Sequence, residues 1–151
     1  TYKNYFWMVP YDLQGLIDSI GGKEAAEKRL DEMFRRLDAS YGYEWFPSGN
    51  EPSFQIPWIY NWAGAPYKAQ QVIRRILNEQ YSSRVNGLPG NDDLGSMGAW
   101  YVFASIGLFP EIPGVGGFSV NSPVFRKIVL HLPEGDVIIK GGDEKKEYIH
   151  S

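Results

Sequence analysis

The chain contains no cysteine and only two histidines among its 151 residues. Without cysteine it has no disulfide, no thiolate metal site and no cysteine nucleophile. The histidines, His131 and His150, lie near the C-terminal end, far along the chain from the acidic segments near residues 50 and 92. A zinc site or a catalytic triad based on histidine is therefore not expected.

The chain also lacks a basic stripe and a long apolar run. It has 15 lysines and arginines against 18 aspartates and glutamates, a formal net charge of −3. Nucleic acid is not an expected partner, because no cluster of positive charge is available to neutralise phosphates. The apolar runs are too short to span a bilayer, so no membrane span is expected. Aromatic residues make up 15% of the chain, which is compatible with a sugar-binding surface.

Apolar spacing indicates helices up to about residue 106 and strands after it. Helices in pairs are predicted over residues 13–20, 23–38, 57–63, 66–81 and 94–106. Strands are predicted over residues 118–120, 124–132 and 137–140, with a turn between the last two. The fold class is thus mainly α with a C-terminal antiparallel β region. The predicted domain boundary assigns residues 1–112 to the helical part and residues 113–151 to the β part.

Two adjacent carboxylates, Asp92 and Asp93, follow Gly90-Asn91 directly before the last predicted helix. A carboxylate at a helix N-terminus meets unpaired N–H groups and the positive end of the helix dipole, which both favour its ionised form. Such a group is suited to accept a proton or to hold a cation. The alternative interpretation is that Asp92 or Asp93 is only an N-cap.

A second loop repeats this order, with Gly49-Asn50 before Glu51 and a short helix after it. Alternate loops of paired helices open on the same end, so the two loops are predicted to face one cavity. Together they offer hard oxygen ligands of the kind that calcium or magnesium prefers: Asn50, Glu51, Asn91, Asp92 and Asp93. The spacing of these residues does not fit an EF-hand.

The five tryptophans divide between core and candidate sugar-stacking residues. Trp45 lies in the loop before Glu51 and is the residue expected to face a ligand. At least two of the five are expected to be core, because Trp is usually largely buried.

Four blocks of the sequence, in order, resemble glycoside hydrolase family 92, the calcium-dependent exo-α-mannosidases. Residues 7–17, WMVPYDLQGLI, are similar to the family's WFVPHDVxGL, and residues 49–61, GNEPSFQIPWIYN, to its GNEPxHxxxxLYN. Residues 90–103, GNDDLGSMGAWYVF, resemble G(N/D)(D/E)DxGxMSAWYVF. Residues 106–110 and 117–125 continue the family's LGFYPVxPG…Y…GSPxF.

The resemblance implies a fold and a location for this chain. Members carry an N-terminal β-sandwich packed on an α/α toroid of paired helices, and the chain then returns to strands. The segment would be a C-terminal fragment, the last part of the toroid with the returning strands. Its implied partners are a mannose-containing glycan and the preceding part of the same protein, which would be secreted or periplasmic and bacterial.

The resemblance also implies chemistry, the hydrolysis of terminal α-mannosides with inversion, with Ca²⁺ holding the 2- and 3-hydroxyls of the sugar. Inversion needs a general acid and a general base, with their carboxyl groups about 6.5–9.5 Å apart. Asp93 matches the base, and Asp92 joins it in the expected catalytic set. The residues expected to bind substrate are Glu51, Asn50, Trp45 and Asn91. The residues expected to bind the metal are Asn50, Glu51 and Asp92.

Two departures from the family pattern matter. Phe54 stands where members often carry histidine, and a phenyl ring forms no hydrogen bond with a sugar hydroxyl. The family's acid Glu would fall two residues before Thr1, so the isolated chain is expected to be inactive. One alternative is a non-catalytic calcium- or carbohydrate-binding module on the same scaffold. Another is a structural helical domain whose acidic loops are helix caps.

Overall fold

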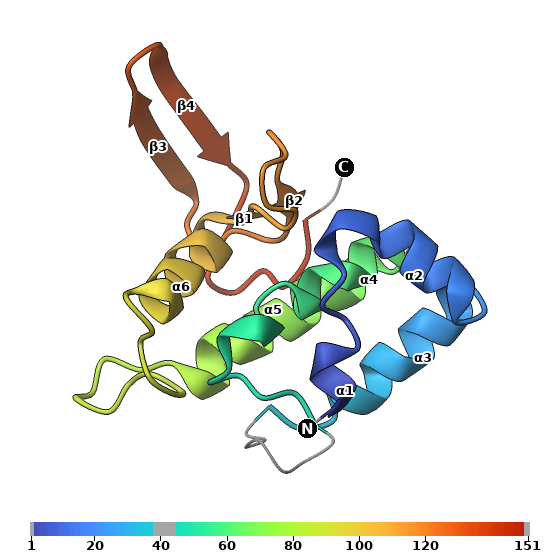
Figure 1. Cartoon of the computed structure of the whole chain (residues 1–151). Helices are drawn as coiled ribbons and strands as arrows, with labels where there is room; N and C mark the ends of the chain where they lie inside the picture. Colours follow the sequence, from blue (N-terminus) through green and yellow to red (C-terminus); the bar gives the residue numbers. More distant parts are fainter. Residues whose placement is uncertain (1, 38–44, 150–151) are drawn as a thin grey trace.

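The computed structural model of the chain describes residues 2–37 and 45–149 (Figure 1). Its α-helices are α1 (Tyr2–Tyr5), α2 (Leu13–Ser19), α3 (Lys23–Met33), α4 (Ile59–Trp62), α5 (Pro66–Gln80) and α6 (Ser96–Ile106). Short 3-10 helices lie at η1 (Pro10–Asp12), η2 (Glu51–Ser53) and η3 (Ile56–Trp58). Within the described residues, no helix has both the length and the apolar character needed to cross a membrane.

Local sequence signals explain where two of these helices begin. Asp12 is the N-cap of α2, and its carboxylate accepts a hydrogen bond from the Gly15 N–H at 3.0 Å. Pro66 opens α5, where its missing N–H costs nothing because the first turn of a helix has no intrahelical acceptor for it. Both starts were expected from the sequence and are confirmed.

Other boundaries differ from the predictions. α3 ends at Met33 rather than at residue 38, which lies outside the described residues. The short helix predicted over residues 57–63 is instead the 3-10 helix η3, which includes Pro57, followed by α4. α1 was not predicted at all.

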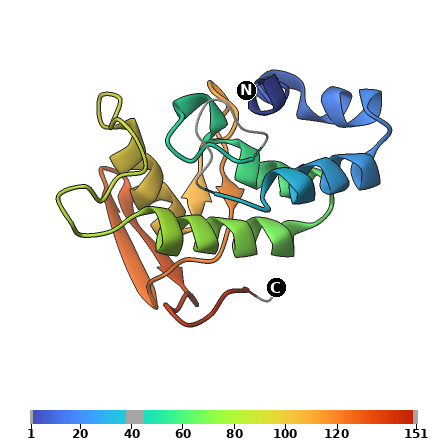
Figure 2. The same cartoon turned by 90° about the horizontal axis from the view of Figure 1, so that it is seen from below.

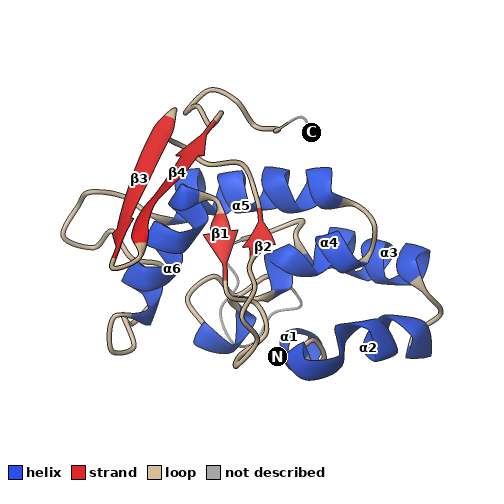
Figure 3. Cartoon of the chain, turned by 90° about the horizontal axis from the view of Figure 1, so that it is seen from above, coloured by secondary structure: helices blue, strands red, loops and turns tan. Residues whose placement is uncertain are grey.

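α5 runs lengthwise along the molecule, beside two groups of elements (Figures 2 and 3). The α2–α3 pair, with α4, lies toward one end, and α6 with the strands lies toward the other. The apolar faces of these helices form a single core. The largest fully buried side chains of the described residues are Trp7, Trp58, Tyr60, Phe46, Leu13, Ile17, Leu30, Ile56, Ile59, Ile73, Ile76 and Met97, of which all but Met97 belong to this core.

The strands form two antiparallel pairs. β1 (Leu108–Phe109) pairs with β2 (Ser119–Val120), and β3 (Lys127–Leu132) pairs with β4 (Gly135–Lys140). The second pair forms a hairpin that projects from the helical body (Figures 1 and 3). The prediction of a mainly α fold followed by antiparallel strands is confirmed. The boundary between residues 112 and 113 stays a prediction, and the β1–β2 ladder joins residues on both sides of it.

A single buried arginine on α5 holds the C-terminal segment in place. The guanidinium of Arg74 donates hydrogen bonds to the carbonyls of Pro123 at 3.2 Å and Lys146 at 3.0 Å, with longer contacts to three others. One turn earlier, the Gln70 side-chain oxygen accepts from the Ile149 N–H at 2.8 Å. These bonds satisfy backbone carbonyls and one backbone N–H that lie outside the strands and helices.

Candidate active site

The two glycine–asparagine loops touch each other through their backbones. A Cβ atom built on Gly49 would lie 2.5 Å from the Pro89 carbonyl oxygen, and one built on Gly90 would lie 2.5 Å from the Gly49 carbonyl oxygen. Real Cβ atoms essentially never approach closer than 3.0 Å. Glycine is therefore needed at both positions for space. The contact brings the turn at Asn50-Glu51 next to the turn at 91–93.

The first loop combines a buried amide with an exposed carboxylate. Asn50 is buried, and its side-chain Nδ2 has no hydrogen-bond partner among the described residues. Glu51 is exposed and opens η2. At the end of this turn the buried Ser53 hydroxyl accepts a hydrogen bond from the Asn4 amide of α1, at 3.3 Å. The first helix of the chain is thereby fixed against the loop that carries Glu51.

The second loop contains a run of left-handed backbone. Asp93 has φ of 49° and Leu94 has φ of 60°, and Gly95 continues the run at 92°. A left-handed conformation costs a non-glycine residue roughly 1–2 kcal/mol. Strain of this kind gathers at functional sites, where the surrounding structure holds it in place. The Ser96 hydroxyl supports the run by donating to the Asp93 carbonyl at 2.8 Å.

Neither aspartate of this loop is the N-cap of α6. The helix begins at Ser96 rather than at residue 94, and its N-cap is Gly95, because the left-handed residues before it cannot belong to a right-handed helix. Asp92 lies before the helix but still forms a hydrogen bond with it, since its Oδ1 accepts from the Gly98 N–H at 3.1 Å. Asp93 is exposed, and among the described residues its carboxylate accepts no such hydrogen bond from the helix. The two adjacent carboxylates therefore have different surroundings.

The tryptophans are mostly core. Trp7, Trp58 and Trp100 are 1%, 0% and 3% exposed, which confirms that at least two of the five belong to the interior. Trp45 is half-buried, and the guanidinium of Arg36 lies 6.0 Å from its ring centroid. That contact joins Trp45 to the end of the α3 region and not to either acidic loop, so its predicted role toward a ligand stays a prediction.

A buried carboxyl group that sequence reasoning missed lies beyond α6. Glu111 is 5% exposed, and its Oε2 accepts hydrogen bonds from the Trp62 indole N–H at 3.2 Å and from the Ser119 hydroxyl. Burial raises the pKa of Glu111, against the opposing effect of these two hydrogen bonds. The signal in the sequence is a lone charge in the apolar stretch 108–115.

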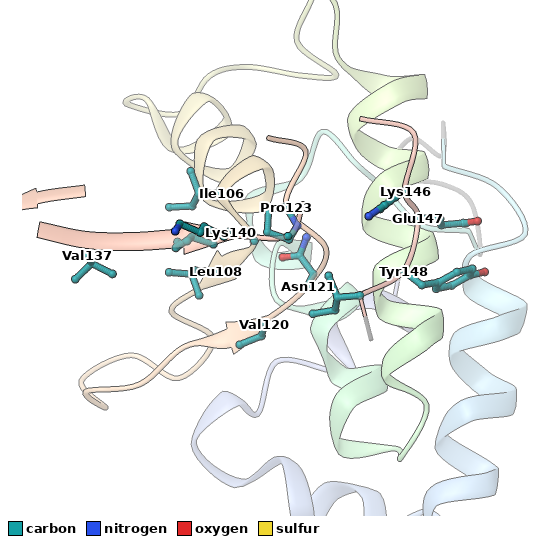
Figure 4. Close-up of a pocket in the computed structure, with 14 residues that line it drawn as sticks. Ile106, Leu108, Val120, Asn121, Pro123, Val137, Lys140, Lys146, Glu147 and Tyr148 are labelled. Carbon is teal, nitrogen blue, oxygen red and sulfur yellow. The ribbon is translucent and has the colours of Figure 1, made fainter. Parts of the chain in front are cut away.

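A concavity that is not formed by the two loops lies elsewhere among the described residues. A groove of about 800 Å³ lies between the end of α6, the two strand pairs and the C-terminal segment (Figure 4). Its lining includes Leu108, Val120 and Val137 and no residue of either acidic loop. Among the described residues, no three Asp, Glu or His side chains gather as a metal site. In this chain the candidate site is thus the place where the two loops contact each other, at Gly49 and Gly90, and it is open rather than enclosed as a pocket.

Comparison with known proteins gives consistent matches over nearly all of the chain. The family model described as "Glycosyl hydrolase family 92 catalytic domain" matches residues 1–151. A protein of Arthroderma benhamiae described as a secreted glycosidase is 34% identical over 137 residues, which cover 88% of this chain and 17% of that protein.

Solved structures agree. A family GH92 α-mannosidase from Bacteroides thetaiotaomicron is 37% identical, with a TM-score of 0.79 over 90% of this chain and 18% of its own. The GH92 glycosyl hydrolase ccman5 is 26% identical, with a TM-score of 0.85 over all of this chain and 24% of its own. The chain thus spans less than a quarter of the length of these relatives. These neighbours confirm the predicted fold, part of an α/α toroid followed by antiparallel strands.

Proposed function

We propose that this chain, which belongs to glycosyl hydrolase family 92, supplies part of the active site of an inverting exo-α-mannosidase. The observation that carries the proposal is the backbone contact between Gly49 and Gly90. It joins two of the four blocks through which the sequence resembles the family, residues 49–61 and 90–103. The activity is proposed for the whole protein, because the chain spans only a fraction of its relatives.

Asp93 is the proposed general base. Its carboxylate is exposed and can accept a proton from a water molecule, as the base of an inverting glycosidase does. Asp92 has a supporting role, since its hydrogen bond to the Gly98 N–H ties the loop to the first turn of α6. The left-handed backbone at Asp93 and Leu94 fixes the direction in which the base projects.

The general acid is proposed to come from outside the segment. In the family pattern the acid Glu falls two residues before Thr1. The Asn4–Ser53 hydrogen bond fixes α1 against η2, so a residue just upstream would enter beside the loop of Glu51. For this reason we expect the isolated chain to have no glycosidase activity.

Calcium is the proposed metal, and the donor set fits it in part. Asn50 is buried, and its side-chain nitrogen, which can only donate, has no acceptor among the described residues, so the amide oxygen is the atom that could face a cation. Asn50 and Glu51 offer hard oxygens, whereas Ca²⁺ takes six to eight oxygen ligands. Asp92 fits less well, because one of its oxygens already accepts from the helix. When bound, the ion would hold sugar hydroxyls in place.

Substrate binding is proposed for the groups that surround the loop contact. Asn50, Glu51 and Asn91 carry amide and carboxylate groups suited to sugar hydroxyls, and Trp45 remains a candidate stacking residue. The ligand class is a glycan with terminal mannose. A secreted or periplasmic location is proposed, supported by the relative described as a secreted glycosidase.

The test uses the whole protein with an aryl α-mannoside as substrate. Asp93→Asn is expected to lower kcat by at least ~10²-fold, the low end of what a general base contributes. Asp136→Asn is the matched control, because that aspartate is exposed on the β3–β4 hairpin beside His131. Near-normal turnover of Asp93→Asn would remove it from the role of base.

One observation favours a second function. Phe54 occupies the position where the family often has histidine, and its ring lies 6.3 Å from that of Trp100. A protein that binds mannosides with calcium and hydrolyses none would be a carbohydrate-binding module on the same scaffold. Calorimetry with calcium and mannose on the whole protein, run beside the activity assay, separates the two functions.

A further inference from the structure

A buried tryptophan connects the two acidic loops. Trp100 lies on α6, and its indole N–H donates a hydrogen bond to the backbone carbonyl of Phe54 at 3.0 Å. Phe54 follows Glu51 by three residues and directly ends η2. One hydrogen bond therefore links the helix that follows the second loop to the turn that forms the first.

The aromatic rings that contact Trp100 come from the segment after the first loop, which holds Phe54 and Trp58, and from the end of α5 before the second loop. The ring of Tyr81, at the end of α5, is stacked on it with centroids 5.8 Å apart and planes 5° from parallel. The Tyr81 hydroxyl donates to the Met97 carbonyl in the first turn of α6, at 3.4 Å. Burial and the nearby charge of Asp92 raise the pKa of Tyr81, which shows that this tyrosine lies within electrostatic reach of the second loop.

We propose that Trp100 is a positioning residue of the active site, whose indole N–H sets the position of the Glu51 turn relative to Asp93. The catalytic part of this inference rests on the proposed function, and the structural part does not. The acceptor is a main-chain atom, so the bond fixes the backbone of the first loop directly. Because the glycine contact fixes the loops at Gly49 and Gly90, the Trp100 bond adds a second point of attachment and so restrains their relative rotation.

A neighbouring tryptophan provides a matched comparison. Trp58 belongs to the same ring cluster, in an edge-to-face contact with Trp100 at 5.6 Å, and it is 0% exposed. Its Nε1 is buried without a hydrogen-bond partner among the described residues. Substitution by phenylalanine makes the same change of volume at both positions but removes a formed hydrogen bond only at Trp100.

The experiment compares Trp100→Phe with Trp58→Phe in the whole protein. Trp100→Phe is expected to lower kcat about 10-fold, with a smaller change of KM, because displacement of catalytic groups by a fraction of an ångström slows the chemical step. It is also expected to speed amide hydrogen exchange in residues 47–56 by about 5–10-fold. Trp58→Phe also leaves a cavity and lowers the overall stability, but it is expected to change kcat and the exchange of residues 47–56 by less than half as much as Trp100→Phe, because it removes no hydrogen bond formed among the described residues.

Two results would overturn the inference: equal effects of the two substitutions on kcat and exchange, or unchanged exchange in Trp100→Phe. Hydrogen exchange does not need turnover, so it decides the matter even if the whole protein hydrolyses no mannoside, which would be a failure of the proposed function alone. If Trp100→Phe does not fold, benzothienylalanine at position 100 keeps the shape of the ring and lacks the N–H. Normal exchange and kcat with this isostere would equally refute a role for the hydrogen bond.

Discussion

Substitution of Gly49 or Gly90 by alanine tests the loop contact on which the proposed site depends. An alanine Cβ at position 49 would lie 2.5 Å from the Pro89 carbonyl oxygen and 3.1 Å from the Gly90 Cα. Relief to the 3.0 Å minimum needs a displacement of at least 0.5 Å, the difference between 3.0 and 2.5. The atoms in the way are backbone, which cannot rotate aside as a side chain does, so the loops themselves must separate.

The size of the effect follows from that displacement. Overpacking of this kind costs about 1–3 kcal/mol of stability. Catalytic groups need to be held within roughly 0.5 Å, and a misplacement of about 1 Å can cost 10²-fold in rate. We therefore expect Gly49→Ala and Gly90→Ala each to lower kcat/KM by about 10- to 100-fold and to lower the melting temperature.

The assay measures kcat/KM on an aryl α-mannoside and thermal unfolding of the whole protein. Gly116→Ala is the matched control, because nothing lies within 4 Å of a Cβ at that position. The double variant Gly49→Ala/Gly90→Ala is expected to lose less than the sum of the single variants, since one separation of the loops relieves both clashes. Unchanged melting temperature and kcat/KM in both single variants would refute the close contact.

Two further predictions concern buried charged groups outside the loops. Because burial raises the pKa of Glu111, this carboxyl group stays protonated in the folded protein at pH values where it is ionised in the unfolded chain. The protein therefore loses stability as the pH rises from about 4.3, the usual carboxyl pKa, to the raised pKa. Glu111→Gln should remove this loss. We expect the melting temperature of the variant, relative to that of the wild type, to rise between pH 4 and pH 8. An equal difference at both pH values would contradict a titrating Glu111. Arg74→Met keeps the stem of the side chain but removes its hydrogen bonds to the carbonyls of Pro123 and Lys146. It should cost roughly 3 kcal/mol and expose residues 142–149 to faster hydrogen exchange, and protection like that of the wild type would contradict the role assigned to Arg74.

Elements defined by local chemistry could be predicted from the sequence. The cap at Asp12, the proline start of α5 and the apolar stripe of that helix each need only a few neighbouring residues. That the two loops lie close together could also be predicted, because helices in pairs return the chain to the same end, whereas the cavity that they were expected to share stays a prediction. The reason that both loops begin with glycine did not follow, since it depends on a contact between residues 41 positions apart in the sequence.

Features that depend on long-range contacts or strain escaped prediction. The left-handed residues Asp93 and Leu94 delay the start of α6, and no propensity favours that conformation for leucine. The bond from Trp100 to Phe54 uses a backbone acceptor, which no side-chain pattern reveals. Glu111 carries a visible charge in an apolar stretch, but only its contacts with Trp62 and Ser119 show that it is buried.

The hydrogen bond from Trp100 is accepted by a backbone atom of residue 54, the position where this chain has phenylalanine and the family often has histidine. Residue 54 accepts the Trp100 hydrogen bond through its carbonyl, which is present whatever its side chain. Phe54→His should therefore keep the loop in place and lose only part of the ring contact with Trp100, about 1 kcal/mol of stability. Any change in activity then reports on the side chain alone. A histidine at this position can donate a hydrogen bond to a sugar hydroxyl, so we expect Phe54→His to change the ratio of kcat/KM values between α-1,2- and α-1,3-linked mannobiose by about 10-fold or more. Phe54→Leu, which also lacks a donor, is the control. The same ratio in all three proteins would show that residue 54 does not contact the substrate.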